Sequence, residues 1–280
     1  MIGGTSFGGV DWVRQEVRRA RSLTDKPFGI GFITHLPGTD ALIRTALDDG
    51  VGIVAYSFGD PAHYVDLAHD AGAVVISQVR TLDEARRAAD AGVDVITAQG
   101  TEAGGHTGVT STLPLVPAVV DEVAPIPVLA AGGIGDGRGI AAALVLGAEG
   151  VWLGTAFLAT FEAGVHAGYK ARVVEAGTDD TVLTTVFDIA GGLPWPPGVA
   201  GRAIRNRFTD EWHGREDDLR AMVAQRAQEL HRIDDPDTAA LYAGPAAAFA
   251  RRIGHANELV RRLGDEAAEE LRTRAATIVR

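Results

Sequence analysis

Two glycine-rich segments carry the residue types best suited to holding a phosphate. They are residues 130–138 (Ala-Ala-Gly-Gly-Ile-Gly-Asp-Gly-Arg) and 153–156 (Leu-Gly-Thr-Ala). Each lies at the end of a short apolar run, 127–129 or 150–153. Because glycine has no side chain, backbone N–H groups in such turns can approach a ligand closely. In a parallel α/β protein, turns of this kind gather at the carboxyl ends of the strands. The pattern therefore predicts a site for a phosphorylated cofactor.

A second candidate site follows the predicted strand 93–97. Residues 99–108 place one histidine, His106, among four glycines. The unperturbed pKa of histidine, near 6.5, lets it accept or donate a proton at neutral pH. His106 is therefore the candidate catalytic base. The alternative is a histidine that only orders the loop.

Polar residues also follow other predicted strands. Thr34 and His35 come after 28–33, and Ser57 follows Val54-Ala55-Tyr56. We expect His35 and Ser57 to contact a substrate, with loop packing or an ordinary turn as the alternatives. Glu102 is expected either to orient His106 or to start a helix. The other histidines are expected at the surface: His63, His69, His166, His213, His231 and His255.

Composition narrows the class of protein. The chain has 280 residues, is 46% hydrophobic and carries a formal net charge of -11, which disfavours a nucleic-acid surface. It contains no cysteine, which excludes disulfides, thiolate nucleophiles and zinc–thiolate sites, and no metal is expected. The amino terminus does not resemble a secretory signal, and Glu149 and several glycines interrupt the longest apolar stretch, 141–161. We therefore expect a soluble, cytoplasmic protein without a membrane partner.

The elements that would position these residues alternate along the first 155 residues. Short apolar runs and helical patterns follow one another at the spacing of compact βα units, which predicts an α/β fold of the TIM-type (β/α)8 barrel. Residues 1–3 read as the tail of a further strand, so the first strand and helix of the barrel are expected to be missing. The predicted strands are 28–33, 52–55, 74–77, 93–97, 127–130 and 150–153, and the predicted helices are 12–21, 39–49, 82–90, 115–122 and 139–146.

Local signals support several of these boundaries. Thr81 is predicted to cap the helix at 82–90, with Glu84 as its capping-box partner. Four helices are predicted to end just before a glycine that serves as a C-cap: Gly50, Gly72, Gly92 and Gly147.

After Thr155 the pattern changes. Residues 157–175 are predicted as helix, 181–189 as β-prone, and 191–198 as a rigid irregular connection. The carboxyl-terminal third is predicted as mostly helix, at 215–228 and 245–280, with Arg251-Arg252 and Arg261-Arg262 on solvated helix faces. We expect a barrel domain formed by 1–165 with 245–280, and a smaller cap formed by 166–244.

Three motifs together resemble those of the nitronate monooxygenase family, formerly called 2-nitropropane dioxygenases. They are residues 99–108, 130–138 and 153–157. Similar motifs occur in the related flavin-dependent enoyl-ACP reductases. The resemblance extends from residue 1 to about 208, although the Pro-Met turn of the family's first strand has no counterpart here.

The resemblance implies an FMN-binding barrel. Backbone groups at Gly132, Gly133, Gly154 and Thr155 would hold the FMN phosphate, and Gln78 would lie near the flavin ring, where family members often have lysine. The alternative for Gln78 is an ordinary polar residue at a strand end. His106 aligns with the family histidine that removes the proton α to the nitro group or contacts the substrate.

The activity implied by the resemblance is oxidation of alkyl nitronates or nitroalkanes by O2 to a carbonyl compound and nitrite. Its partners would be small molecules, namely the nitro compound and O2. Two alternatives stay open. One is an NAD(P)H-dependent flavoenzyme similar to the enoyl-ACP reductases, and the other is a catalytically silent flavin-binding protein.

Overall fold

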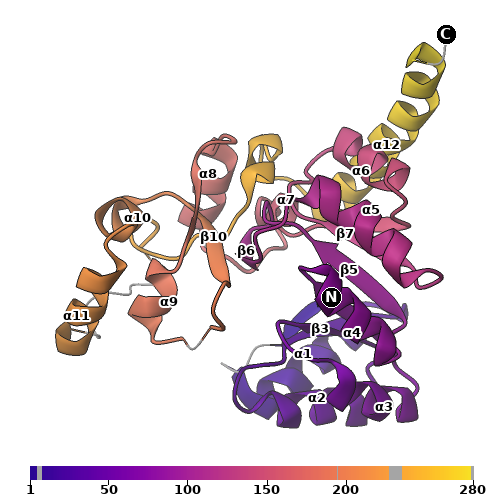
Figure 1. The fold of residues 1–280 in the computed structure, drawn as a ribbon, viewed down its shortest axis with the longest axis horizontal. Helices are drawn as coiled ribbons and strands as arrows, with labels where there is room; N and C mark the ends of the chain where they lie inside the picture. Colours follow the sequence, from indigo (N-terminus) through magenta and orange to yellow (C-terminus); the bar gives the residue numbers. More distant parts are fainter. Residues whose placement is uncertain (5–7, 194, 227–234, 279–280) are drawn as a thin grey trace. The chain divides into compact units, whose positions relative to one another are not determined.

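The computed structural model describes residues 1–4, 8–193, 195–226 and 235–278 (Figure 1). The chain divides into two compact units. The first comprises residues 1–98 and 117–129, and the second comprises residues 99–116 and 130–280.

A parallel sheet forms the frame of the fold. Its hydrogen-bonded order is β1-β2-β3-β4-β5-β7-β8, and β1 to β5 pair in parallel with continuous register. The barrel-type α/β prediction is confirmed, and a seventh strand lies at residues 2–4, one residue later than the predicted 1–3. The strands are β1 (Ile2–Gly4), β2 (Gly29–Ile33), β3 (Ile53–Ser57), β4 (Val74–Val79), β5 (Val95–Gln99), β7 (Val128–Ala131) and β8 (Gly150–Trp152).

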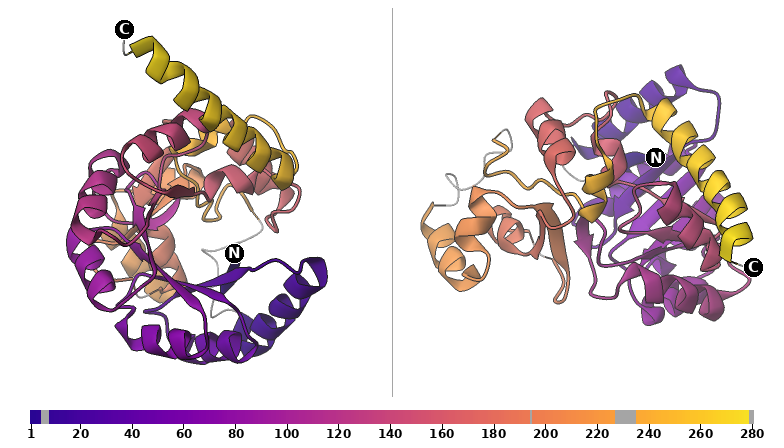
Figure 2. Two further views of the ribbon diagram at one scale, coloured as in Figure 1. Left: turned by 90° about the vertical axis from the view of Figure 1, so that its right-hand side faces the viewer. Right: turned by 90° about the horizontal axis from the view of Figure 1, so that it is seen from above.

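Four helices pack on one face of the strands of the first unit (Figure 2, left). They are α1 (Gly9–Leu23), α2 (Thr39–Asp48), α3 (Ala62–Asp70) and α4 (Leu82–Asp90). The predicted C-cap glycines are confirmed, because Gly50, Gly72, Gly92 and Gly147 all have positive φ, a backbone conformation that favours glycine. Helix α3 is the helix that was predicted to end before Gly72, for which no start was predicted.

The capping prediction at α4 is half right. Thr81 Oγ1 accepts a hydrogen bond from the Glu84 backbone N–H at 3.1 Å, as predicted. The Glu84 carboxylate, however, accepts from the Arg80 N–H at 2.7 Å and pairs with the Arg80 guanidinium, so it does not close the box on Thr81.

The register of the parallel strands sorts side chains into two faces. Phe32, Tyr56, Ser77 and Ile96 are aligned across β2 to β5, and Tyr56 packs on Tyr64 of α3 at 5.5 Å between ring centroids. Since side chains alternate along a strand, the next aligned row lies on the other face. That row is Ile33, Ser57, Gln78 and Thr97.

The second unit adds a three-stranded antiparallel sheet of order β6-β10-β9. Its strands are β6 (Gly105–Thr107), β9 (Thr181–Thr184) and β10 (Ala200–Ile204). The remaining helices are α5 (Thr112–Val123), α6 (Gly137–Val145), α7 (Thr155–Leu158), α8 (Ala167–Glu175), α9 (Val186–Gly191), α10 (Arg207–Trp212), α11 (Glu216–Arg226), the 3-10 helix η2 (Pro245–Phe249) and α12 (Ala256–Ile278).

Several predictions in this unit were wrong in detail. The single helix expected at 157–175 is two helices, α7 and α8, and the β-prone stretch 181–189 is strand only to Thr184 before α9 begins. The helix expected at 245–280 is η2 and α12 with a connection between them, so Arg251 and Arg252 do not lie on a helix. The end of the helix expected at 215–228 lies outside the described residues, as does His231.

Two clusters of buried residues hold this unit together. One contains Val173, Ile204 and Leu241, and the other contains Phe187, Phe208, Trp212 and Leu219.

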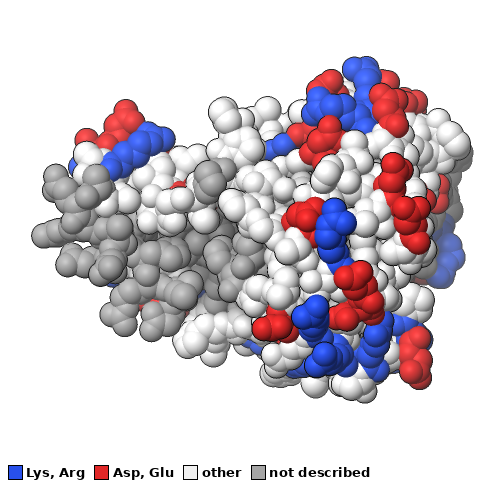
Figure 3. Space-filling model, turned by 90° about the horizontal axis from the view of Figure 1, so that it is seen from below, with Lys and Arg blue, Asp and Glu red and all other residues white. Residues whose placement is uncertain are grey.

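Acidic and basic side chains are interspersed on the face shown in Figure 3. Within the described ranges, no helix has both the length and the apolar character to cross a membrane.

Candidate active site

His106 lies in the short strand β6, where the sequence suggested only a loop. Its backbone is held because β6 pairs with β10, with His106 opposite Gly201, and because the Gln99 side-chain amide donates to the His106 carbonyl oxygen at 3.1 Å. Thr107 Oγ1 donates to the Gly100 carbonyl oxygen at 2.9 Å. These hydrogen bonds therefore order the glycine-rich segment and fix the position of the His106 backbone.

The imidazole of His106 pairs with Asp188 of helix α9. Nε2 lies 2.8 Å from Asp188 Oδ1, and the two side chains are 9% and 7% exposed. Asp188 Oδ2 is buried and has no hydrogen-bond partner among the described residues. A buried carboxylate at this distance fixes the ring orientation and stabilises a positive charge formed on the ring.

Aromatic rings enclose the same imidazole. Trp195 stacks on His106 with ring centroids 3.5 Å apart and planes 13° apart, and the Tyr242 ring is 5.2 Å away. A Cβ added at Gly201 would lie 2.6 Å from the Tyr242 ring and 3.4 Å from His106 Nε2, so this close packing requires glycine. Burial, and to a smaller degree the nearby Asp188 carboxylate, raises the pKa of Tyr242, which therefore stays a neutral phenol.

Asp188 was not among the residues singled out from the sequence. The available signal was a single acidic residue in the apolar run 182–190, which is the signature of a buried charge. The alternative that Glu102 orients His106 is wrong, because the Glu102 carboxylate accepts from the Thr112 N–H at 2.9 Å and from Thr112 Oγ1 at 2.8 Å. Glu102 thus contacts the first residue of α5, but no helix starts at Glu102 itself, so the other predicted role is wrong as well.

Glycine is needed at different positions of the two glycine-rich turns for different physical reasons. Gly132 and Gly133 have φ values of 106° and 71°, and Cβ atoms there would lie 2.9 Å from the Gly100 carbonyl oxygen and 3.1 Å from Glu102 Cβ. The packing of the chain itself therefore requires these two glycines. At Gly154, by contrast, an added Cβ would meet nothing within 4 Å. The space beside Gly154 fits an external group such as a phosphate.

Thr155, the residue after Gly154, joins this turn to a distant part of the second unit. Its hydroxyl accepts a hydrogen bond from the Gly244 N–H at 3.0 Å, and the side chain is buried. Gly244 in turn lies directly before η2. This hydrogen bond therefore holds the turn that contains Gly154 in place.

Gln78, Ser57 and His35 all belong to the first unit. Ser57 and Gln78 are register partners at the ends of β3 and β4, and Thr97 of β5 continues the row. The Thr97 hydroxyl is buried without a partner among the described residues. Half-buried His35 follows Thr34, whose hydroxyl donates to the Ser57 carbonyl oxygen at 3.1 Å.

Phe58, directly after Ser57, has a backbone conformation that the sequence did not reveal. Its φ of 63° is positive, which no other described non-glycine residue shows. Such strained conformations persist where the surrounding structure enforces them and are concentrated at functional sites. The Arg80 guanidinium lies 5.2 Å from the centre of the Phe58 ring.

The remaining described histidines lie at the surface, as expected. The side chains of His63, His69, His213 and His255 are 74%, 40%, 40% and 57% exposed, and His166 is also exposed. No cluster of three metal-ligating side chains occurs in the part of the chain that the structure describes.

A parallel βα sheet with glycine-rich turns after its last two strands is the architecture of barrel enzymes that hold phosphorylated ligands at their strand ends. The family model described as nitronate monooxygenase matches residues 37–266. The chain belongs to this family, whose members are flavin-dependent oxidoreductases related to the flavin enoyl reductases.

Two solved structures are similar over nearly the whole chain. FabK from Thermotoga maritima is 32% identical, with a TM-score of 0.84 over 96% of this chain and 85% of its own. The nitroalkane oxidase from Streptomyces ansochromogenes is 30% identical, with a TM-score of 0.82 over 98% of this chain and 89% of its own.

A curated relative from Mycobacterium tuberculosis, (3aS,4S,5R,7aS)-5-hydroxy-7a-methyl-1-oxo-octahydro-1H-indene-4-carboxyl-CoA dehydrogenase, is 38% identical over 66% of this chain and 52% of its own length. The chain spans about half the length of the first curated relatives it matches.

Proposed function

We propose that this protein is an FMN-dependent enzyme that oxidises alkyl nitronates or nitroalkanes with O2 to a carbonyl compound and nitrite. The observation that carries the proposal is the buried His106–Asp188 pair, which provides a base at the position implied by the family resemblance. Membership of the nitronate monooxygenase family and similarity to a nitroalkane oxidase support it.

The residues assigned to FMN are those implied by the resemblance. Backbone N–H groups at Gly132, Gly133, Gly154 and Thr155 would hold the phosphate, and the open space at Gly154 fits this role. Gln78 would lie near the ring. A bound flavin would accept electrons from the substrate and pass them to oxygen.

His106 performs the proton transfer in this proposal. With Nε2–H donated to Asp188, the lone pair that accepts the proton from the α-carbon is on Nδ1. Asp188 fixes this tautomer and stabilises the imidazolium that forms. Trp195 and Tyr242 exclude bulk water from the ring, which strengthens this electrostatic contribution. His35 and Ser57 are proposed substrate contacts.

Gln78 distinguishes this chain from family members with lysine at this position. A neutral amide donates hydrogen bonds but brings no positive charge to stabilise a reduced, anionic flavin. A lower reduction potential than in lysine-containing relatives is therefore expected.

A second candidate function is reduction of an enoyl thioester with NAD(P)H, as in the flavin-dependent enoyl-ACP reductases. The 32% identity and TM-score of 0.84 to FabK favour it. The indene-carboxyl-CoA dehydrogenase among the relatives is likewise named for a CoA thioester.

Aerobic nitrite release from propyl-2-nitronate, measured with and without NADH, separates these functions. Nitrite formation by the FMN-loaded chain without NADH is the expected result. NADH-dependent reduction of an enoyl thioester without nitrite would overturn the proposal in favour of the second function. Neither activity would indicate a flavin-binding protein that is catalytically silent.

A further inference from the structure

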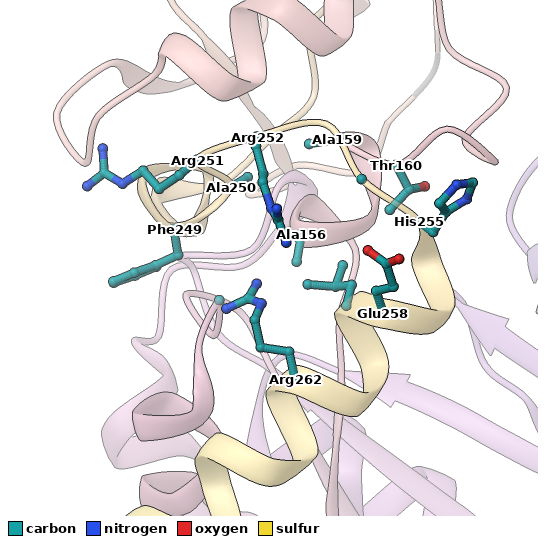
Figure 4. Close-up of a pocket in the computed structure, with 13 residues that line it drawn as sticks. Ala156, Ala159, Thr160, Phe249, Ala250, Arg251, Arg252, His255, Glu258 and Arg262 are labelled. Carbon is teal, nitrogen blue, oxygen red and sulfur yellow. The ribbon is translucent and has the colours of Figure 1, made fainter.

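A cavity of about 450 Å³ opens in the second unit (Figure 4). Neither His106 nor Asp188 is among the residues that line it. It lies among α7, η2, the connection 250–255 and the first turns of α12. Its walls are in part apolar, from Ala156, Ala159, Phe249 and Leu259. This volume is in the range of small-molecule sites.

Two arginines enter this cavity from opposite sides. Figure 4 shows Arg252, from the connection before α12, and Arg262, from α12 itself, with their guanidinium groups extending toward one another. Arg251 also lines the cavity, but its guanidinium extends away from the other two. Convergence of two like charges is unfavourable unless an anion lies between them.

The acidic side chains near the cavity leave a surplus of positive charge. Arg262 bonds Glu266 Oε1 at 2.8 Å, whereas Arg252 has no acidic partner in the described part of the chain. Glu258 also lines the cavity, and His255 pairs with Glu162 at 3.1 Å. Of the two converging guanidinium groups, that of Arg262 is therefore paired with Glu266, and that of Arg252 is left without an acidic partner among the described residues, with Glu258 as the carboxylate in the lining.

The start of α12 does not provide this positive charge. Glu162 Oε2 accepts a hydrogen bond from the Ala256 N–H at 3.0 Å, so the first turn of the helix is already capped by a carboxylate. Any anion in the cavity would be held by the arginine side chains, whose planar donors match the oxygens of a phosphate.

We propose that this cavity binds a small organic phosphate ester of about nucleotide size, with the phosphate between Arg252 and Arg262 and the organic part against the apolar wall. The site goes beyond the proposed function, since its lining includes neither His106 nor Gly154, although Gly135 and Ala156 of the two glycine-rich segments border it. It adds a second phosphate-recognition element to the chain.

Calorimetric titration of the full chain with AMP and with inorganic phosphate tests this proposal. The titration is run with and without saturating FMN, so that its outcome does not depend on flavin binding or on nitrite release. Saturable binding of AMP, tighter than that of phosphate, is expected in both cases. Absence of saturable AMP binding, or equal affinity for AMP and phosphate, would overturn the proposal.

Substitutions of exposed arginines locate the site. Arg252→Ala and Arg262→Ala should each weaken AMP binding by at least about tenfold, the usual effect of losing a charge-assisted hydrogen bond to phosphate. Arg261→Ala is the matched control, because it removes the same charge from the adjacent residue of α12, which does not line the cavity. Equal weakening by Arg261→Ala would indicate non-specific attraction and would refute the assignment.

Discussion

Asp188 changes what can be said about His106. A histidine in a glycine-rich loop can be a base or a mere loop-ordering residue, and the sequence left both interpretations open. A carboxylate 2.8 Å from Nε2, buried together with the imidazole, is the arrangement by which proteins orient a base and stabilise its protonated form. The pair is separated by 82 residues in sequence, which is why no local motif reveals it.

His106→Ala should abolish proton abstraction while leaving the flavin bound. Activity on neutral nitroalkanes is expected to fall by about 10²- to 10⁴-fold, the usual contribution of a general base. Activity on pre-ionised nitronates should fall much less, because these substrates have already lost the proton. Steady-state rates with both substrate forms, at equal flavin content, make the comparison. Equal losses on both would rule out the role as base.

Asp188→Asn should affect the same step through the orientation and charge of the imidazole. An amide keeps the shape of the side chain but removes its negative charge, so kcat/KM on neutral nitroalkanes is expected to fall by about 10- to 100-fold. Rates on nitronates should again be less affected, which a purely structural role would not produce. Asp180→Asn is a control, because the Asp180 carboxylate accepts from the Gly177 N–H in an exposed turn, away from His106 in the sequence. A loss of similar size with both substrate forms would argue against the positioning role.

Gly154→Ala is the sharpest test of the phosphate turn. An Ala side chain there meets no protein atom within 4 Å, so it should obstruct only a ligand. The dissociation constant for FMN is expected to rise by at least about tenfold, with little change in thermal stability. Gly164→Ala serves as the control, since an added Cβ there also meets nothing within 4 Å.

Gly133→Val is a less specific variant. Valine at a φ of 71° is strained, and its Cβ would crowd Glu102, so loss of flavin would accompany loss of stability. Unchanged FMN affinity in Gly154→Ala would therefore count against the phosphate site more directly than any result with Gly133→Val.

At the level of elements, helices and strands whose ends are marked by neighbouring residues could be predicted from the sequence. Elements that depend on contacts between distant residues could not. The helix Leu82–Asp90 was predicted with its observed bounds, because Thr81 and Gly92 mark its two ends locally. Strands β6 and β10 were missed because they depend on pairing with each other across 95 residues, as in His106 opposite Gly201. The stretch 181–189 shows the same limit, since β-prone residues such as Val186 and Phe187 lie in α9, where tertiary packing buries them.

Thr81→Ala tests the local signal. The Thr81 hydroxyl accepts from the first turn of α4, and loss of such a cap costs about 1 kcal/mol of unfolding free energy. Urea denaturation of both proteins measures the difference. Thr178→Ala is the control, because the exposed Thr178 hydroxyl has only a 3.5 Å contact with its neighbour Asp179. An effect no larger than that of the control would show that the cap does not stabilise the helix.

The candidate site was predicted to a similar extent. His106 and the glycine turns could be singled out as candidates because glycine-rich sequence at a strand end is a local pattern. Asp188, Trp195 and Tyr242 were not, since their roles arise only when α9, the connection after it and the segment before η2 meet β6. The sequence also could not separate Gly154, which faces open space, from Gly132, which the fold itself requires.

On the scale of the whole molecule, buried tyrosines predict how stability depends on pH. Burial raises the pKa of all four tyrosines in the chain, and most strongly that of Tyr56, Tyr169 and Tyr242. In the unfolded chain these phenols ionise near pH 10. Their contribution to stability is therefore complete below pH 10 and is lost as the pH rises further, because the unfolded state then binds fewer protons than the folded state.

The expected loss is at most about 1.4 kcal/mol per pH unit for each tyrosine above pH 10. Urea unfolding at a series of pH values from 8 to about 11.5 measures the slope. Tyr56→Phe should reduce it by about a quarter to a third, and should not destabilise the protein at neutral pH, because the buried Tyr56 hydroxyl has no hydrogen-bond partner among the described residues. A slope that does not change in Tyr56→Phe would contradict this explanation.

Titration of the purified chain with FMN tests the central claim most directly, namely that this fold holds a flavin in the turns after its last two strands. After removal of any bound cofactor, added FMN should bind saturably with one flavin per chain, shift the flavin absorbance and raise the melting temperature. A chain that is folded by circular dichroism, yet leaves the FMN spectrum and its own melting temperature unchanged, would contradict the account.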